Sequence, residues 1–168
     1  MRRIFRSNRG ITLMELLITA VIIGVVATMA IPRFQMAYTK HKFNGVNRDV
    51  TSSFRLARSM AITDKEQYGI NFDIENGIYT LFKDKVNLTG YDFVSGDSVI
   101  RVDTMPPEFS YIITDVENHT FLFRPNGSSR YNGGGNVVLL ANSDNVVAIF
   151  TNNILTATGR VQSIADFY

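Results

Sequence analysis

One carboxylate stands inside the most apolar segment of the chain. From Ile11 to Ile31 the sequence has 21 residues, and Glu15 is the only charged residue among them. A charged side chain in hydrocarbon costs a few kcal/mol, so an acid in such a segment marks a functional site that needs a cationic partner. Glu15 is therefore the first candidate functional residue.

The length of this segment suits a membrane. At about 1.5 Å per residue, a helix from Ile11 to Ile31 spans roughly 31 Å, which matches the hydrocarbon core of a bilayer. Basic residues without acidic neighbours precede it: Arg2, Arg3, Arg6 and Arg9. The positive-inside rule then predicts a single-pass protein with a cytoplasmic N-terminus and with everything after Pro32 outside.

Three interpretations of this segment compete. A secretory signal would use the small residues of Thr28-Met29-Ala30 as its cleavage site, although Pro32 is then an awkward neighbour and Glu15 has no role. An uncleaved anchor also leaves Glu15 without a role. The third interpretation starts from the residues around Glu15 themselves.

The segment Arg9-Gly10-Ile11-Thr12-Leu13-Met14-Glu15-Leu16-Leu17 resembles the prepilin leader and cleavage site. The resemblance implies that a prepilin peptidase cuts between Gly10 and Ile11 and that Ile11 is then N-methylated. Gly10 suits such a cut because a residue without Cβ lets a protease approach the backbone closely. Two departures from the usual pattern are a first mature residue of Ile11, where phenylalanine is usual, and a somewhat long leader.

Cleavage at Gly10 would also give Glu15 its partner. Glu15 would become the fifth residue of the mature chain, and the freed α-amine of Ile11 on a neighbouring subunit could reach its carboxylate. A buried charge without an opposite charge beside it is strongly destabilising, whereas the attraction within an ion pair roughly offsets the free-energy cost of removing both charges from water. The pair would therefore set the stagger between subunits, with Glu15 as the assembly residue.

The rest of the chain predicts one long helix followed by β structure. Pro32 is expected to break or kink the helix at the membrane exit, after which the helix resumes. An apolar stripe at steps of three and four predicts a face that packs on a sheet: Phe43, Val46, Val50, Phe54, Ala57 and Ala61. The polar residues expected largely elsewhere are Lys42, Asn47, Arg48, Arg55 and Arg58.

After Ile62 the pattern indicates short strands with turns between them. Gln67 to Ile74 and Ile78 to Lys83 flank Asn76-Gly77, the pair favoured in a two-residue hairpin. Further strands are predicted at 99–102, 111–114, 120–124, 137–141, 146–151 and 154–158, with Asn152-Asn153 as a turn. The fold class is therefore α+β, a long N-terminal helix packed on an antiparallel sheet or small sandwich. The predicted divisions are 1–10 (leader), 11–31 (membrane and filament-core helix), 32–62 (amphipathic helix) and 63–168 (periplasmic β domain).

A second resemblance covers most of the remainder. The segments 54–62 (Phe-Arg-Leu-Ala-Arg-Ser-Met-Ala-Ile), 123–127 (Phe-Arg-Pro-Asn-Gly) and Gly159-Arg160-Val161 look like the GspH/FimT group of minor pilins and pseudopilins. This resemblance implies a pilin-like fold, an inner-membrane location, and assembly with other pilins into a type IV pilus or a type II secretion pseudopilus.

Nucleic-acid capture is the rival function. Some FimT-like proteins are implicated in DNA uptake through a Gly-Arg-x-Arg motif, but here Gly159-Arg160-Val161-Gln162 lacks the second arginine. DNA contact would then rest on Arg160 with Arg130 or Arg124. Without the first ten residues the chain has 13 basic and 15 acidic side chains, a net charge of −2, which disfavours bulk attraction of nucleic acid.

Other chemistry has little to build on. The sequence has no cysteine, and His41 and His119 are far apart, so neither a metal nor another cofactor is expected. Asp115, Glu117 and Asp144 fit no known cation loop. No serine stands in a nucleophile motif, and the chain is therefore not expected to be an enzyme.

Overall fold

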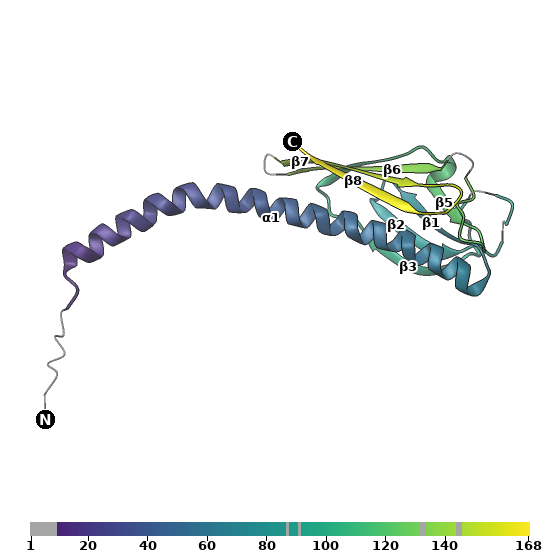
Figure 1. Cartoon of the computed structure of the whole chain (residues 1–168), viewed down its shortest axis with the longest axis horizontal. Coiled ribbons are helices and arrows are strands. Elements are labelled where there is room, and N and C mark those ends of the chain that lie inside the picture. The colour runs from purple at the N-terminus through teal and green to yellow at the C-terminus, as the bar shows by residue number, and fades with distance from the viewer. Residues whose placement is uncertain (1–9, 87, 91, 132–133, 144–145) are drawn as a thin grey trace, which may run out of the picture. The chain divides into compact units, whose positions relative to one another are not determined.

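The computed structural model describes residues 10–86, 88–90, 92–131, 134–143 and 146–168. The chain divides into two compact units, residues 1–37 and 38–168, which are described separately. The elements in chain order (Figure 1) are α1 (Leu13–Asp64), β1 (Tyr68–Asp73), β2 (Ile78–Lys83), β3 (Ser98–Thr104), β4 (Phe109–Thr114), η1 (Glu117–His119), β5 (Thr120–Phe123), β6 (Gly135–Ser143), β7 (Val146–Ile154) and β8 (Val161–Phe167).

The helix α1 does not break at Pro32. It runs for 52 residues with Pro32 inside it, so the predicted break there is wrong. Proline removes one backbone hydrogen bond, but its fixed φ near −65° suits a helix, and the turns on both sides keep their own bonds. The preceding turn carries a further contact, from the hydroxyl of Thr28 to the carbonyl oxygen of Val25 at 2.8 Å.

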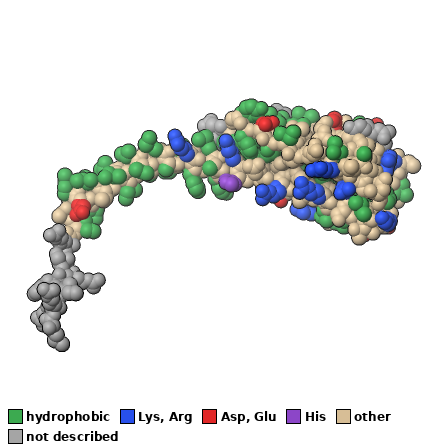
Figure 2. Space-filling model, viewed as in Figure 1, with side chains coloured by type: hydrophobic (Ala, Val, Ile, Leu, Met, Phe, Trp, Pro, Cys, Tyr) green, Lys and Arg blue, Asp and Glu red, His purple; other side chains and the backbone are tan. Residues whose placement is uncertain are grey.

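In the first unit the helix exposes its apolar side chains. Most of the large apolar residues between Leu13 and Ile31 are more than half exposed, and no part of the most apolar window is buried, although its mean hydropathy is 2.3. Figure 2 shows hydrophobic side chains along this segment and an acidic one near its start. By length and composition, α1 could cross a membrane.

The second unit contains two four-stranded antiparallel sheets. The strand orders are β3-β2-β1-β5 and β4-β6-β7-β8. β1 and β2 form the predicted hairpin, but its loop has four residues, 74–77, because Asp73 pairs with Ile78. The carboxylate of Asp73 accepts hydrogen bonds from the backbone and side-chain nitrogens of Asn76, which lower the pKa of Asp73.

The predicted apolar face of the helix packs on both sheets. Phe54 lies against Phe121 of the first sheet, with ring centroids 5.2 Å apart, and Phe43 lies against Phe109 of the second at 5.5 Å. Five of the six predicted stripe residues are fully buried, and Val46 is partly buried against the same core. The α+β fold, with one long helix on antiparallel sheets, is confirmed.

The end of the chain differs from the prediction. Asn152-Asn153 is not a turn but lies inside β7, and 154–158 is not a strand, because β7 ends at Ile154 and a turn follows. The last strand, β8, is missing from the prediction. It pairs with β7 along its length, yet most of its side chains are exposed on both faces, so its sequence shows no alternation of apolar and polar residues.

Candidate functional site

The start of α1 is set by a side-chain cap. Residues 10–12 are not helical, and the helix begins at Leu13. The backbone N–H of Glu15 donates to the hydroxyl oxygen of Thr12 at 3.2 Å, and the N–H of Leu16 donates to the Thr12 carbonyl at 3.1 Å. Thr12 is thus the N-cap of a Thr-x-x-Glu sequence, which satisfies backbone donors that the first turn would leave unpaired. The Gly10–Ile11 peptide stays outside the helix.

Glu15 lies on the exposed surface of the first helical turn. Among the described residues its carboxylate takes part in no ion pair. Its neighbours Met14 and Leu16 are apolar and about two-thirds exposed. A lone acid on an apolar surface is poorly placed in this subunit taken alone, and it is available to a cation from elsewhere.

Gly10 makes no contact that would require a glycine. A Cβ added there would meet none of the described atoms within 4 Å, and its backbone is not in the left-handed region. The part of the chain that the structure describes therefore gives no structural reason for glycine at this position. The leader residues 1–9 lie outside the described residues.

The three later motifs converge on Arg58. Its Nε donates to the carbonyl oxygen of Gly127 at 3.0 Å and to that of Thr158 at 2.8 Å. Gly127 and Gly159 both have positive φ, and a Cβ on Gly159 would lie 2.2 Å from the Gly127 carbonyl oxygen. Segments 54–62, 123–127 and 159–161 therefore form one junction where α1 meets two loops.

The arginines proposed for DNA contact border two different hollows. Arg160 borders a hollow of about 260 Å³ together with Arg55 and Arg58. Arg124 and Arg130 border a different hollow of about 450 Å³, where Arg130 Nη1 donates to Gln67 Oε1 at 3.0 Å.

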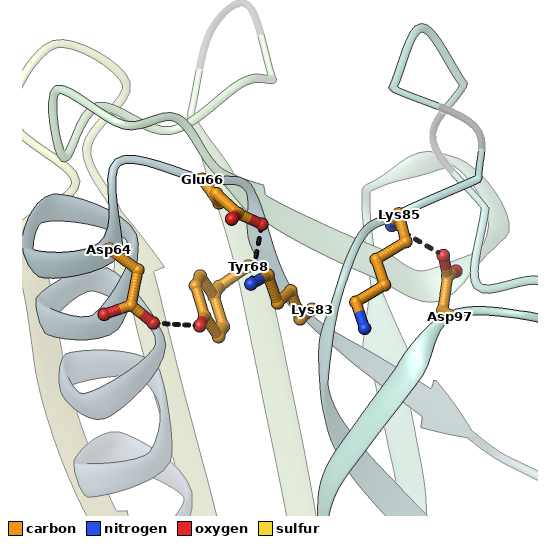
Figure 3. A network of polar contacts seen from close by, with 6 residues as sticks. All are labelled: Asp64, Glu66, Tyr68, Lys83, Lys85 and Asp97. Carbon is orange, nitrogen blue, oxygen red and sulfur yellow. Dashed lines mark hydrogen bonds and ion pairs between the residues drawn. The ribbon is translucent and has the colours of Figure 1, made fainter.

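A polar network closes the end of α1 (Figure 3). The hydroxyl of Tyr68 donates to the carboxylate of Asp64, and Lys83 pairs with Glu66 at 2.7 Å. Burial and the Asp64 carboxylate raise the pKa of Tyr68 to about 12. Asp97 accepts the backbone N–H of Lys85 at 3.0 Å, and these contacts hold the ends of neighbouring segments together.

A buried polar cluster was not expected from the sequence. Asn47, predicted to point largely away from the core, is buried, and its Nδ2 donates to Ser163 Oγ at 2.9 Å. Asn152 Nδ2 donates to Asn47 Oδ1 at 2.9 Å, and the hydroxyl of Thr51 donates to Asn152 Oδ1 at 3.2 Å. Asn47 and Thr51 are four residues apart on one helix face, which was the available signal.

No metal site is visible in the described ranges. They contain no group of three His, Cys, Asp or Glu side chains that could hold an ion. His41 and His119 are both exposed. Asp144, one of the acids considered for calcium, lies outside the described residues.

Comparison with known proteins identifies the family. Residues 5–31 match the family described as the prokaryotic N-terminal methylation motif, and residues 47–154 match the type II transport protein GspH. No curated protein sequence matches the chain.

Solved structures share the fold. The minor pseudopilin EpsH of the Vibrio cholerae type 2 secretion system is similar with a TM-score of 0.53 and 10% identity, over 73% of this chain and 95% of that one. The type IV minor pilin FimU of Pseudomonas aeruginosa is similar with a TM-score of 0.55 and 11% identity, over 74% and 89%. A second crystal form of FimU gives 0.52 and 13%, over 72% and 91%.

The fold is therefore that of a pilin-like subunit. The chain belongs to the GspH family of type II transport proteins. This family consists of pilin-like subunits, and the methylation motif implies processing by a prepilin peptidase and assembly with other pilins. The comparisons give no support to the DNA-binding alternative.

Proposed function

We propose that the chain is cut between Gly10 and Ile11, methylated on the α-amine of Ile11, and built into a filament as a structural subunit without enzymatic activity. In this proposal the first residues are cytoplasmic before the cut, α1 anchors the protein in the bacterial inner membrane, and the β domain lies in the periplasm. Glu15 then pairs with the Ile11 amine of a neighbouring subunit.

Glu15, which is exposed on the apolar first turn and has no ion pair among the described residues, carries this proposal. Leaving that carboxylate without a cation in an apolar filament core would be strongly destabilising, whereas a neighbour's amine restores the balance. The Thr12 cap supports the same arrangement, because it keeps Gly10 and Ile11 outside the helix. A protease can bind a non-helical peptide in extended form, and the new α-amine lies outside the helix, where it can pair with another subunit.

The processing step is tested by the intact mass of the membrane form. We expect a chain that begins at Ile11 and is heavier by one methyl group. Gly10→Val should leave the leader attached, because a β-branched side chain would keep the peptidase from the backbone, whereas a Cβ at Gly10 meets none of the described atoms of the fold within 4 Å. Wild-type chain that still begins at Met1, or that begins at Ile31, would overturn the proposed cut.

The assembly step needs its own variant. Glu15→Gln should be processed as well as wild type but lost from the sheared filament fraction. Thr19→Val is the matched control, because Thr19 lies one turn further along the same helix and its hydroxyl donates to the carbonyl oxygen of Leu16. Normal incorporation of Glu15→Gln into filaments would contradict the proposed pairing of Glu15 with the Ile11 amine.

A further inference from the structure

Basic side chains gather where α1 runs beside β8. The face that Figure 2 presents carries a series of Lys and Arg side chains along the domain. His41, Arg48 and Arg55 follow one another on α1 at steps of seven residues, about two helical turns each, and Arg58 comes three residues after Arg55 on the adjoining face. Arg160 precedes β8 and borders the same hollow as Arg55 and Arg58. We call this surface the arginine groove, defined by Arg48, Arg55, Arg58 and Arg160.

The groove is formed by two adjoining hollows. The smaller, of about 260 Å³, is bordered by Arg55, Arg58 and Arg160. The larger, of about 520 Å³, is bordered by His41, Asn44, Arg48 and Arg55 with Ser163 of β8. Arg55 borders both hollows, so the two form one polar surface along the helix.

The groove brings cations together without balancing them. The ion pairs among the described residues involve Lys42, Lys83 and Arg101, and none involves an arginine of the groove. Arg58 is held in place by the carbonyls of Gly127 and Thr158, which accept from its Nε. Neighbouring like charges repel, so this surface gains from an anion that enters it.

The chemistry of guanidinium groups narrows the choice of anion. Their planar donor forks match carboxylates and phosphates in bidentate geometry. Single-stranded nucleic acid binds on aromatic stacking surfaces within a positive groove, and among the described residues no aromatic side chain borders either hollow. After the proposed cut the chain carries 13 basic and 15 acidic side chains, which opposes a long polyanion but not a few carboxylates at short range.

We propose that the arginine groove docks acidic side chains of another subunit of the filament. The inference rests on the proposed function, because it needs neighbours in a filament, and it goes further by naming the surface and the chemistry of the partner. The helix that carries the groove also carries the apolar segment assigned to the filament core. Carboxylates on the partner would enter between Arg55 and Arg160.

A zero-length cross-link tests the groove in the full-length protein in its own filaments. Arg55→Lys and Arg160→Lys keep the charge and add an amine that a carbodiimide can join to any carboxylate in contact. We expect each variant to give, at the substituted position, an isopeptide link to an Asp or Glu of another filament subunit. Its yield should be at least tenfold above that of Arg124→Lys, the control, because Arg124 is exposed outside the groove.

The outcomes separate this inference from the proposed function. If the wild-type chain is neither cut nor present in filaments, the proposed function fails. If the variants enter filaments but position 55 and position 160 give no link above the control, the docking proposal alone is overturned. It is also overturned if a labelled oligonucleotide binds wild type and loses tenfold or more in affinity with Arg55→Ala and Arg160→Ala, which would assign the groove to nucleic acid.

Discussion

Asn152 Nδ2 donates a hydrogen bond to Asn47 Oδ1 at 2.9 Å, although 105 positions separate the two residues. Both side chains are buried, and the hydroxyl of Thr51 completes the cluster by donating to Asn152. A buried amide keeps its partner only when helix and strand meet in one register. The pair therefore fixes how α1 lies on β7, in a way that interchangeable apolar contacts could not.

Removing both amides should cost less than the sum of removing each one alone. Asn47→Ala leaves the Asn152 amide donor in the interior without its acceptor, and we expect a loss of about 1–3 kcal/mol in the free energy of unfolding. The double variant with Asn152→Ala should lose less than the sum of the two single variants. Urea unfolding in detergent, followed by near-ultraviolet circular dichroism, measures both. Asn142→Ala, on an exposed position of β6, is the control, and strict additivity would contradict the expected coupling.

Gly159 should not tolerate a side chain. Its φ is 61°, and a Cβ would come 2.2 Å from the carbonyl oxygen of Gly127. Gly159→Ala should therefore destabilise the domain by about 1–3 kcal/mol from backbone strain, with the collision in addition. Gly45→Ala is the matched control, because a Cβ there meets nothing within 4 Å in α1, and a gain of up to about 1 kcal/mol is expected. Equal melting temperatures for the two variants would be the contrary result.

Stability should fall as the pH rises from 10 to 12. The pKa of Tyr68 and that of Tyr79 are both raised to about 12 from 10.0, chiefly by burial. The unfolded chain ionises first, so the favourable contribution of these neutral phenols is complete below pH 10 and disappears as the pH approaches 12. Tyr68→Phe should reduce the slope of stability against pH in this window. Tyr38→Phe should not, because Tyr38 is 67% exposed; identical slopes for all three proteins would refute the assignment.

Loss of the Thr12 cap should change the rate of cleavage at the proposed cut. Thr12→Val removes the oxygen that accepts from the Glu15 N–H, which costs about 1 kcal/mol at the helix start. We expect faster amide hydrogen exchange at 15 and 16 and a changed rate of leader removal. Thr12→Ser keeps the acceptor and should restore both readouts. The contrary result is a processing rate that is normal with Thr12→Val and altered with Thr12→Ser. The rate would then depend on side-chain shape, which indicates recognition of Thr12 by the peptidase and not an effect of the cap.

The sequence predicted the parts of the fold that follow from simple periodicity. The stripe from Phe43 to Ala61 repeats at helical spacing and is buried as expected, and the first hairpin follows from alternation around a turn pair. The sequence did not predict β8, because an edge strand with both faces exposed has no alternation of apolar and polar residues. Asn152-Asn153 has the composition of a turn, but in the fold both residues pair with β6 and β8, and the Asn152 side chain finds its partner Asn47 on α1, far away in the sequence.

The candidate site could be predicted from the sequence only in part. The single acid in an apolar run can be read directly from the residues, and so can the small residue before the proposed cut. The Thr12 cap has a signal in the Thr-x-x-Glu spacing, but the same residues also belong to the cleavage motif, which accounts for them without a cap. The arginine groove depends on Arg160 lying beside Arg55 and Arg58, which only the path of the loop after β7 determines.

The cap at Thr12 also sets how far a freed terminus could reach. Because the helix starts only at Leu13, a chain cut after Gly10 would carry its amine on two residues of non-helical backbone, a tether of roughly 7 Å at full extension. An amine on such a tether can reach a neighbour's carboxylate before the whole subunit has reached its final axial position. The ion pair would then form before the subunits are fully aligned, and small errors in the axial position of each new subunit could still be corrected.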